Sequence, residues 1–407
     1  MSPTRAMARK GPILRKRSPH LADVALVVPS SRFPGVAEYS ARTVAALAQI
    51  ANVHLVLDGP PSVEIRRHAA RVHVGDTSIC ESCPTIVILG NHVQNRLALS
   101  VLDQQWANVA VLHDASLFNL LDSVDYFEDG KDAGILSPSD FAWRERDLLR
   151  WRSNPLLVPF PILPRSLGDV SVVVHSPAQC EPLQNLGISA TYLPVAAADR
   201  FAQVRKANVP QVVLREILGM GPEPFQIVTL GYVEKNKKPE VLINAVRLLQ
   251  DWGIEAGLTL AGTVHPHSRD HYWSEAERVG ISHRVRFESA ISDRRYAMLA
   301  HAADVVVQLR DPFFGQLSGA VADAFEMALP VMASGELLQA IPDLPEYSHA
   351  LPAVTSSIAV ADALEGYASR GESVALSTKS WERYMHVHSF DQYAGGLIDV
   401  LAQAAGQ

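Results

Sequence analysis

The sequence has few cysteines, no long apolar run and no apolar segment of signal-peptide length near its start. Three cysteines in 407 residues cannot form a disulfide framework, a shortage typical of proteins in a reducing compartment. No run approaches the ~18–20 apolar residues of a membrane-spanning helix. The first residues, MSPTRAMARKGPILRKRSPH, also lack the apolar core of a secretion signal. These absences predict a cytoplasmic protein.

Acidic residues are missing from the first seventeen positions, which carry six basic residues: Arg5, Arg9, Lys10, Arg15, Lys16 and Arg17. The formal net charge of the chain is −7, so the chain without these six charges stands at −13. Such an acidic body is a poor binder of nucleic acid, and we predict no nucleic-acid partner. Residues 1–21 are expected to form a basic disordered tail. The alternative is peripheral contact with anionic lipid at the inner membrane face, at ~1 kcal/mol per basic residue.

Short β-branched runs alternate with amphipathic helical windows along most of the chain. The runs include ADVALVVP, NVHLVLDG and TIVILGN in the first half, and FQIVTLGY, GLTLAGTV and ADVVVQL in the second. In the window PEVLINAVRLLQ, one face of the expected helix holds Val241, Leu242, Ala245, Leu248 and Leu249. Apolar strand runs separated by helices indicate parallel strands in doubly wound sheets, an α/β fold.

The alternation breaks between YLPVAAADRF and PEPFQIVTL, and this break predicts two domains. We assign residues 22–200 to a first Rossmann-like domain and residues 201–385 to a second, with the boundary near residues 196–222. A C-terminal helix is expected over residues 386–407, and packing back onto the first domain is one arrangement open to it. Two such domains face each other across a cleft at the carboxyl ends of their strands, where these sheets bind ligands.

The segment FAWRERDLLRWR interrupts the first domain and has two open interpretations. It is either a basic amphipathic helix that exposes Trp143 and Trp151, or a helix packed against the domain.

Two strand-to-helix turns carry groups suited to an anion or a sugar. In PSSRFPGVAEYS, Gly35 makes a tight turn before a helix that starts near Glu38, and the free N–H groups of the helix face that turn. In LGYVEKNKKPEVLINA, a turn at Gly231 precedes Lys237 and Lys238 at the mouth of a helix. The helix dipole disfavours cations there, so anion binding, for example of a diphosphate, explains the lysines better. The alternative is a pair of surface lysines.

A third turn lies in LRDPFFGQLSGAVADAFEMALPV. Ser318 and Gly319 stand at the helix start, where N–H donors face the cleft edge. Gln316 lies on the loop and Asp323 about two turns further on, and both side chains can bind the hydroxyls of a sugar or a ribose. The alternative for Asp323 is a solvated helix position.

Two further clusters have ligand-type residues but incomplete metal spacing. The pair Cys80 and Cys83 in CESC has no second pair to complete four ligands. The loop HPHSRDH holds histidines, which near a cleft more often bond ligand or water than metal; its residues are His265, His267, Asp270 and His271. We predict no metal.

The set PGVAEYS, LGN, LHD, VHS, GYVEKNKKPEVLINA and DPFFGQLSGAVADAFEMALPV resembles the large retaining family of two-Rossmann-domain glycosyltransferases, the GT-B enzymes of family four. Members of this family resemble sucrose synthases and bacterial mannosyltransferases. The resemblance covers roughly residues 22–335, in the order and spacing of the family. Each motif alone is weak, whereas the ordered set is specific.

The resemblance implies a role for each matching residue. Gly35 would lie in the first glycine loop, near the donor diphosphate and the acceptor, and His113 would reach the donor sugar close to the reacting carbon. Lys237 would bind the diphosphate and stabilise the leaving group. Gln316 and Asp323 fall where the family has a pair of glutamates, the first touching the transferred sugar and the second holding the ribose. The other donor-side positions are Gly231, Tyr232, Lys238, Ser318 and Gly319.

Three positions depart from the family pattern. Tyr232 stands where an arginine often follows the strand-end glycine, Gln316 stands for the first glutamate, and Ala328 replaces a glycine before the Pro-Val step. The first two remove charge from the site.

Two functions follow from the resemblance. The first is an active retaining hexosyltransferase of glycoconjugate or polysaccharide biosynthesis, with a nucleotide-diphosphate sugar as co-substrate and no cofactor. Its acceptor would be a glycan, a lipid-linked molecule or a small molecule. The second is a non-catalytic relative that binds a sugar nucleotide or glycan, or supports a partner enzyme. An epimerase on the same plan is a weaker third alternative, since it would turn over a free sugar nucleotide.

Overall fold

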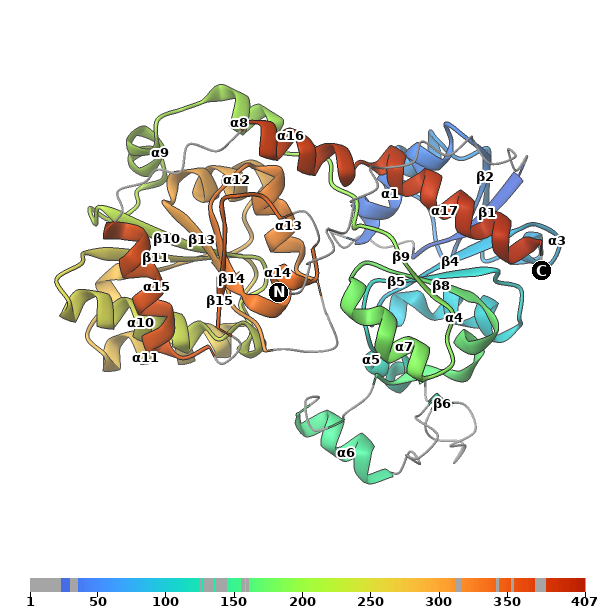
Figure 1. The fold of residues 1–407 in the computed structure, drawn as a ribbon, viewed down its shortest axis with the longest axis horizontal. Coiled ribbons are helices and arrows are strands. Elements are labelled where there is room, and N and C mark those ends of the chain that lie inside the picture. The colour runs from blue at the N-terminus through green and yellow to red at the C-terminus, as the bar shows by residue number, and fades with distance from the viewer. Residues whose placement is uncertain are drawn as a thin grey trace, which may run out of the picture.

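The chain folds into two parallel β-sheets, each covered by helices on both faces (Figure 1). The structure is a computed structural model. It describes residues 23–29, 36–124, 126, 135–136, 145–154, 158, 161–311, 317–341, 344–352, 355–369 and 378–406. The α/β prediction of two Rossmann-like domains is confirmed.

The first sheet has seven strands in the order β3-β2-β1-β4-β5-β8-β9. Their bounds are β1 Asp23–Val27, β2 Asn52–Leu57, β3 Arg71–Val74, β4 Thr85–Leu89, β5 Val109–Leu112, β8 Ser171–Val174 and β9 Ala190–Tyr192. The accompanying α-helices are α1 Val36–Leu47, α2 Val63–Arg66, α3 Ile79–Ser82, α4 Arg96–Asp103, α5 Phe118–Ser123, α6 Glu145–Ser153 and α7 Cys180–Asn185. Short 3-10 turns are η1 Val93–Asn95, η4 Arg165–Asp169 and η5 Pro177–Gln179, and a small antiparallel pair joins β6 Ile135–Leu136 to β7 Leu163–Pro164.

Alternate residues of β1 pack into two different hydrophobic cores, one on each face of the sheet. Val24 and Leu26 pack with α1, whereas Ala25 and Val27 pack on the opposite face with α4. All four side chains are fully buried. A strand without a polar face needs cover on both sides, so the apolar run ADVALVVP enforces the doubly wound arrangement.

The second sheet has six strands in the order β12-β11-β10-β13-β14-β15. Their bounds are β10 Phe225–Leu230, β11 Ala256–Ala261, β12 Val285–Glu288, β13 Val305–Gln308, β14 Val331–Ser334 and β15 Ser348–Leu351. The accompanying α-helices are α8 Ala202–Ala207, α9 Gln211–Leu218, α10 Pro239–Asp251, α11 Pro266–Arg278, α12 Asp293–Ala302, α13 Gly319–Glu326, α14 Gly335–Gln339, α15 Ser357–Ser369 and α16 Thr378–Val387. The 3-10 turns are η6 Lys235–Lys237 and η7 Ser282–Arg284.

Helix α10 confirms the predicted apolar face. Leu242, Ala245 and Leu249 are buried in the core beside β10, and Val241 and Leu248 pack against the same core. Burying a leucine side chain contributes about 1.5–3 kcal/mol, so this face holds the helix to the sheet.

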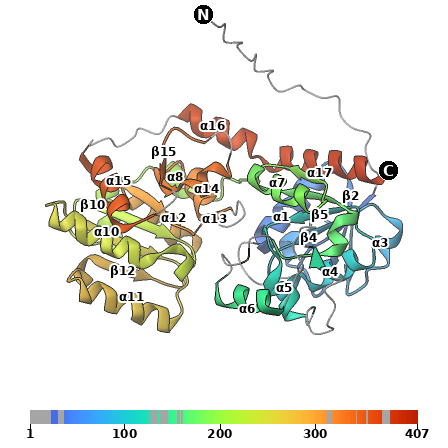
Figure 2. The ribbon, with the colours of Figure 1, turned by 60° about the horizontal axis from the view of Figure 1, so that its bottom comes forward.

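The last helix, α17 Phe390–Ala405, packs on the first sheet and not on the second (Figures 1 and 2). Leu397 and Leu401 are fully buried in the core that also holds Val44 and Leu47 of α1. The helix begins later than residue 386 because α16 ends at Val387 and the Ser389 side chain caps α17, accepting the Gln392 N–H at 3.3 Å.

The chain crosses between the sheets at two places, which are hydrogen-bonded to each other. The Ala197 N–H donates to the His388 carbonyl at 2.6 Å, and His388 Nδ1 lies 2.9 Å from the Val195 carbonyl oxygen. The linker near Ala197 and the segment near His388, where the chain crosses back to the first sheet, therefore connect the two domains side by side.

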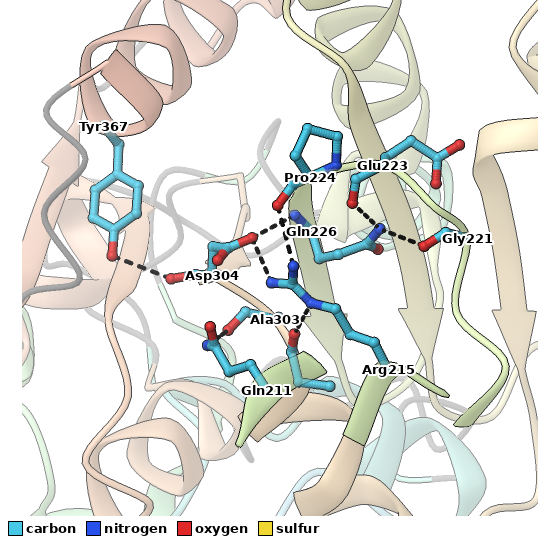
Figure 3. A network of polar contacts seen from close by, with 10 residues as sticks. Gln211, Arg215, Gly221, Glu223, Pro224, Gln226, Ala303, Asp304 and Tyr367 are labelled. Carbon is cyan, nitrogen blue, oxygen red and sulfur yellow. Dashed lines mark hydrogen bonds and ion pairs between the residues drawn. The ribbon is translucent and has the colours of Figure 1, made fainter. Parts of the chain in front are cut away.

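Past the linker, α9 is anchored to the amino edge of the second sheet (Figure 3). Arg215 donates to the Ala302 carbonyl and to Asp304 Oδ2, both at 2.8 Å. The Gln226 N–H donates to the same Asp304 oxygen at 2.6 Å. This network fixes the base of the second domain, at the end of the sheet opposite to the carboxyl ends of its strands.

Helix α6 shows in part whether the segment FAWRERDLLRWR is exposed or packed against the first domain. Trp151 is 5% exposed, and its ring lies 5.0 Å from that of Phe118. The packed interpretation is therefore correct for Trp151, while Trp143 lies outside the described residues. Within the described ranges, no helix is long and apolar enough to cross a membrane.

Candidate functional site

The carboxyl ends of the two sheets face each other near Asp114 and Arg310. Asp114 follows β5 of the first sheet, and Arg310 follows β13 of the second. The negative charge of Asp114 raises the pKa of Arg310 against the larger lowering effect of burial. The two carboxyl edges therefore lie close enough together for these charges to interact.

Lys237 lies over the end of β10. Its Nζ atom is 3.0 Å from the position that a Cβ at Gly231 would take, and Gly231 has a left-handed φ of +84°. The same Cβ position is 3.8 Å from Cβ of Ala320 in the first turn of α13. The left-handed backbone therefore favours glycine at 231, and a side chain there would also displace the ammonium group.

Burial lowers the pKa of Lys237 to about 8, with a further lowering by Arg310 and an opposing effect of Glu234. A cation withdrawn from water beside a second cation is unfavourable unless an anion joins it. Lys237 is thus partly buried, which favours the anion-binding interpretation over that of a surface lysine.

Lys238 is held differently from its neighbour. It is the N-cap of α10 with a left-handed φ of 50°, and its Nζ lies 2.7 Å from Asp311 Oδ1. Tyr232, next to Gly231, is 51% exposed. The structure thus brings Lys237 to the strand end, pairs Lys238 with a carboxylate and leaves Tyr232 at the surface.

Helix α13 presents its first turn at this edge. Ser318 is its N-cap and is 4% exposed, without a side-chain capping bond among the described residues. A Cβ added at the exposed Gly319 would meet nothing within 4 Å in the described part of the chain. Among the described residues nothing lies against Gly319, and the N–H groups at the very start of a helix suit a negatively charged ligand.

Asp323 is joined to the linker. It forms an ion pair with Arg200, and its Oδ2 accepts the Tyr296 hydroxyl at 2.9 Å. Arg200 also reaches Glu326, whose Oε1 accepts the Ala198 N–H at 2.9 Å. The side chain of Asp323 is 20% exposed, so the interpretation as a solvated position is wrong.

His113, at the end of β5, belongs to an aromatic cluster. Its ring is edge-on to Tyr39 at 5.1 Å between centroids and lies 4.9 Å from that of His175. Its Nε2 atom is buried and has no hydrogen-bond partner among the described residues. Burial lowers the pKa of His113 to about 4, so the ring is neutral at pH 7. A neutral imidazole is suited to bonding a hydroxyl group.

The sequence interpretation missed three residues of this edge: Arg310, His175 and Tyr39. Arg310 directly follows the apolar run ADVVVQL, and His175 lies near the end of the run DVSVVVHS. Their positions at the ends of predicted strands could have identified both as candidate site residues. Tyr39 gave no signal because it lies within a helix.

Two predicted site residues, Gly35 and Gln316, lie outside the described residues. Both cysteines of CESC are buried, and burial raises the pKa of each thiol. In the part of the chain that the structure describes, no group of three or more His, Cys, Asp or Glu could hold a metal.

A cavity of about 1080 Å³ lies elsewhere, at the amino edge of the second sheet. It is lined by residues such as Gln211, Phe225 and Asp304, and none of the predicted site residues borders it. Gln211 and Asp304 are already hydrogen-bonded within the protein, Gln211 to Ala303 and Asp304 to Arg215 and Gln226. We therefore place the candidate site at the carboxyl edge.

No protein-family model matches the chain, and a search of curated proteins found no similar sequence. Solved structures are similar in fold. Sucrose-phosphate synthase from Thermosynechococcus elongatus has a TM-score of 0.61 at 17% identity, over 95% of this chain and 99% of that one. A glycosyltransferase from Rickettsia africae has 0.59 at 12% identity, with the same two coverages. HepE from Anabaena, solved with UDP and glucose, has 0.51 at 16% identity, also over 95% and 99%. At these identities the likeness shows the fold, which is the predicted GT-B fold of glycosyltransferases.

Proposed function

We propose that the protein is a retaining glycosyltransferase that moves a sugar from a nucleotide-diphosphate sugar to a hydroxyl group of an acceptor. The observation that carries this proposal is the ammonium group of Lys237, partly buried over Gly231 beside the first turn of α13. The solved structures of HepE with UDP and with UDP-glucose support a nucleotide-sugar ligand for a chain of this fold.

In the proposed reaction, the bond between the sugar and the diphosphate breaks while the acceptor oxygen bonds to the same face of the sugar. The acceptor proton passes to a departing phosphate oxygen. Lys237 and the N–H groups of α13 stabilise the negative charge that grows on the diphosphate. His113, neutral and with an Nε2 atom that no described residue bonds, would hydrogen-bond a hydroxyl of the donor sugar. Asp323 would hold the ribose if Arg200 releases one of its oxygens.

The transferred sugar would be a hexose. The acceptor would be a glycan, a lipid-linked molecule or a small molecule. The basic residues of the tail, outside the described ranges, would support a peripheral contact with an anionic membrane.

A second candidate is a non-catalytic relative that binds a sugar nucleotide or glycan. One observation favours it: Asp323, which the resemblance assigns to the ribose, is engaged by Arg200 and Tyr296.

A thermal-shift screen with UDP-, GDP- and ADP-sugars tests both candidates. A ligand at a hundred times its dissociation constant adds ~2.7 kcal/mol to the free energy of unfolding, so a clear rise of the melting temperature is expected. Release of nucleoside diphosphate in the presence of glycan or glycolipid acceptors then distinguishes the enzyme from the binding protein. If no sugar nucleotide and no free nucleoside diphosphate raises the melting temperature, the proposed site is wrong.

A further inference from the structure

The proposed diphosphate site lacks the arginine that the resemblance places directly after the strand-end glycine, since Tyr232 stands there. A different arginine reaches the same edge. Arg310 follows β13, the neighbour of β10 in the sheet, and it is partly buried. Arg310 and Lys237 are distant in sequence, but neighbouring parallel strands bring their carboxyl ends side by side, where one ligand can bridge them.

The loops that carry the two cations are tied together. The Asp311 N–H donates to the Asn236 carbonyl at 3.2 Å, and the Asp311 carboxylate pairs with Lys238 at 2.7 Å. Asn236 precedes Lys237, and Asp311 follows Arg310. The backbone bond and the ion pair therefore connect the loop that carries Lys237 to the loop that carries Arg310.

Both cations converge on the start of α13. The Arg310 N–H donates to Ser334 Oγ, and its Nη1 donates to the Leu317 carbonyl, each at 3.0 Å. Leu317 directly precedes the N-cap of α13. Lys237 lies near the same turn, because its Nζ atom and Ala320 Cβ are 3.0 Å and 3.8 Å from the position that a Cβ at Gly231 would take.

The described part of the chain does not neutralise the two charges. Among its residues, neither Lys237 nor Arg310 forms an ion pair, although Asp114 and Glu234 act on Arg310 from a distance. Arg310 lowers the pKa of Lys237, which shows that the two positive charges interact unfavourably. An anion bound between them would turn this repulsion into a net attraction.

We propose that Arg310 binds the diphosphate together with Lys237, in the part that the resemblance gives to an arginine at the position of Tyr232. A guanidinium group suits this part because its parallel N–H donors match two phosphate oxygens. The identification of the ligand as a nucleotide donor rests on the proposed function, whereas the pairing of the two cations on a diphosphate does not.

The test is calorimetric titration of the full chain at pH 7 with inorganic pyrophosphate, UDP, GDP and ADP. Arg310→Gln should weaken binding of pyrophosphate, and of the nucleotide that the wild type prefers, by about tenfold or more. Arg278→Gln is the matched control, because it removes one positive charge from an exposed helix position of the same domain. Its affinities should equal those of the wild type.

A rescue variant sharpens the result. In the double variant Tyr232→Arg, Arg310→Gln, the arginine returns to the position that the resemblance predicts. Recovery of most of the lost pyrophosphate affinity is expected if both positions serve the same phosphate groups.

Each remaining outcome decides between the two proposals. Unchanged affinity in Arg310→Gln overturns the inference and leaves the proposed function standing if the wild type binds a nucleoside diphosphate. Arg310-dependent binding of pyrophosphate without binding of any nucleotide supports the cation pair and contradicts the proposed function. Binding of none of the four probes by the wild type overturns both. If Arg310→Gln does not fold, Arg310→Lys replaces it. We expect this variant to bind pyrophosphate about three- to tenfold more weakly than the wild type, and an unchanged affinity would overturn the inference.

Discussion

The two strand edges that meet in the cleft differ in charge. The edge of the second sheet holds Lys237 and Arg310, two cations without an ion pair among the described residues. The edge of the first sheet holds His113 and His175, and burial lowers their pKa values to about 4 and about 3, so both are neutral at pH 7. The second domain therefore supplies positive charge, and the first supplies neutral histidines next to the carboxylate of Asp114. Such a division suits a ligand with an anionic part and a part rich in hydroxyls.

The supports of the two edges differ as well. The cationic edge is held by backbone and ionic contacts, such as the pair of Lys238 with Asp311. The neutral edge is held by aromatic packing, in which Tyr39 contacts both histidines and Tyr393 of α17. The Tyr39 hydroxyl also accepts the Ala196 N–H of the linker at 3.0 Å. The neutral edge thus depends on the packing of the C-terminal helix α17 against the first domain.

The largest expected effect is on turnover, at the neutral edge. His113→Ala should lower turnover about 100-fold or more and leave donor affinity nearly unchanged, because the lost bond acts mainly in the transition state. Steady-state kinetics and calorimetry measure the two quantities. His68→Ala, an exposed histidine of the same domain, is the control. Normal turnover in His113→Ala would remove this residue from the mechanism.

The next effect is on affinity, at the cationic edge. Lys237→Ala should weaken binding of nucleoside diphosphate by ~1.5–3 kcal/mol, the range for a hydrogen bond to a charged group. Binding of the nucleoside without phosphates should hardly change. Lys235→Ala, in the same turn but exposed, is the matched control. An equal loss for nucleoside and nucleoside diphosphate would show that Lys237 acts through folding.

A smaller effect concerns pH. The pKa of Lys237 is lowered to about 8, so the free protein loses this charge as the pH rises through that value. Affinity for a nucleoside diphosphate should therefore fall by up to about tenfold from pH 7 to pH 9, and Lys237→Ala should abolish the dependence. Calorimetry across this range gives the slope. A wild-type affinity that is flat to pH 9 would contradict a charged role for Lys237.

The smallest effect is on stability, at the amino edge of the second sheet, opposite to the cationic edge. Ala328 follows α13 with a left-handed φ of 60°, at the position where the resemblance places a glycine. Ala328→Gly should raise the free energy of unfolding by about 0.5–1 kcal/mol, because glycine adopts this conformation without steric cost. Ala322→Gly, inside the same helix, should lower it by about 1 kcal/mol. Denaturant unfolding of the three proteins tests both signs.

Much of the fold could be predicted from local pattern. The alternation of apolar runs and amphipathic windows predicted the parallel sheets, and the apolar face of residues 239–250 packs as expected. The pattern could not set the start of α17, which depends on the Ser389 cap and the end of α16. The environment of Trp151 was equally open, because burial against Phe118 depends on a segment distant in sequence.

The sequence by itself determined that Gly231 and His113 stand at strand ends, directly after apolar runs, and that Lys237 lies in the turn that follows Gly231. Only the tertiary structure decided which of them meet. Parallel strands bring their carboxyl ends to one edge whatever their separation along the chain, so Arg310 joins Lys237 and His175 joins His113. The same packing ties Asp323 to Arg200 of the linker, a contact that no local pattern contains.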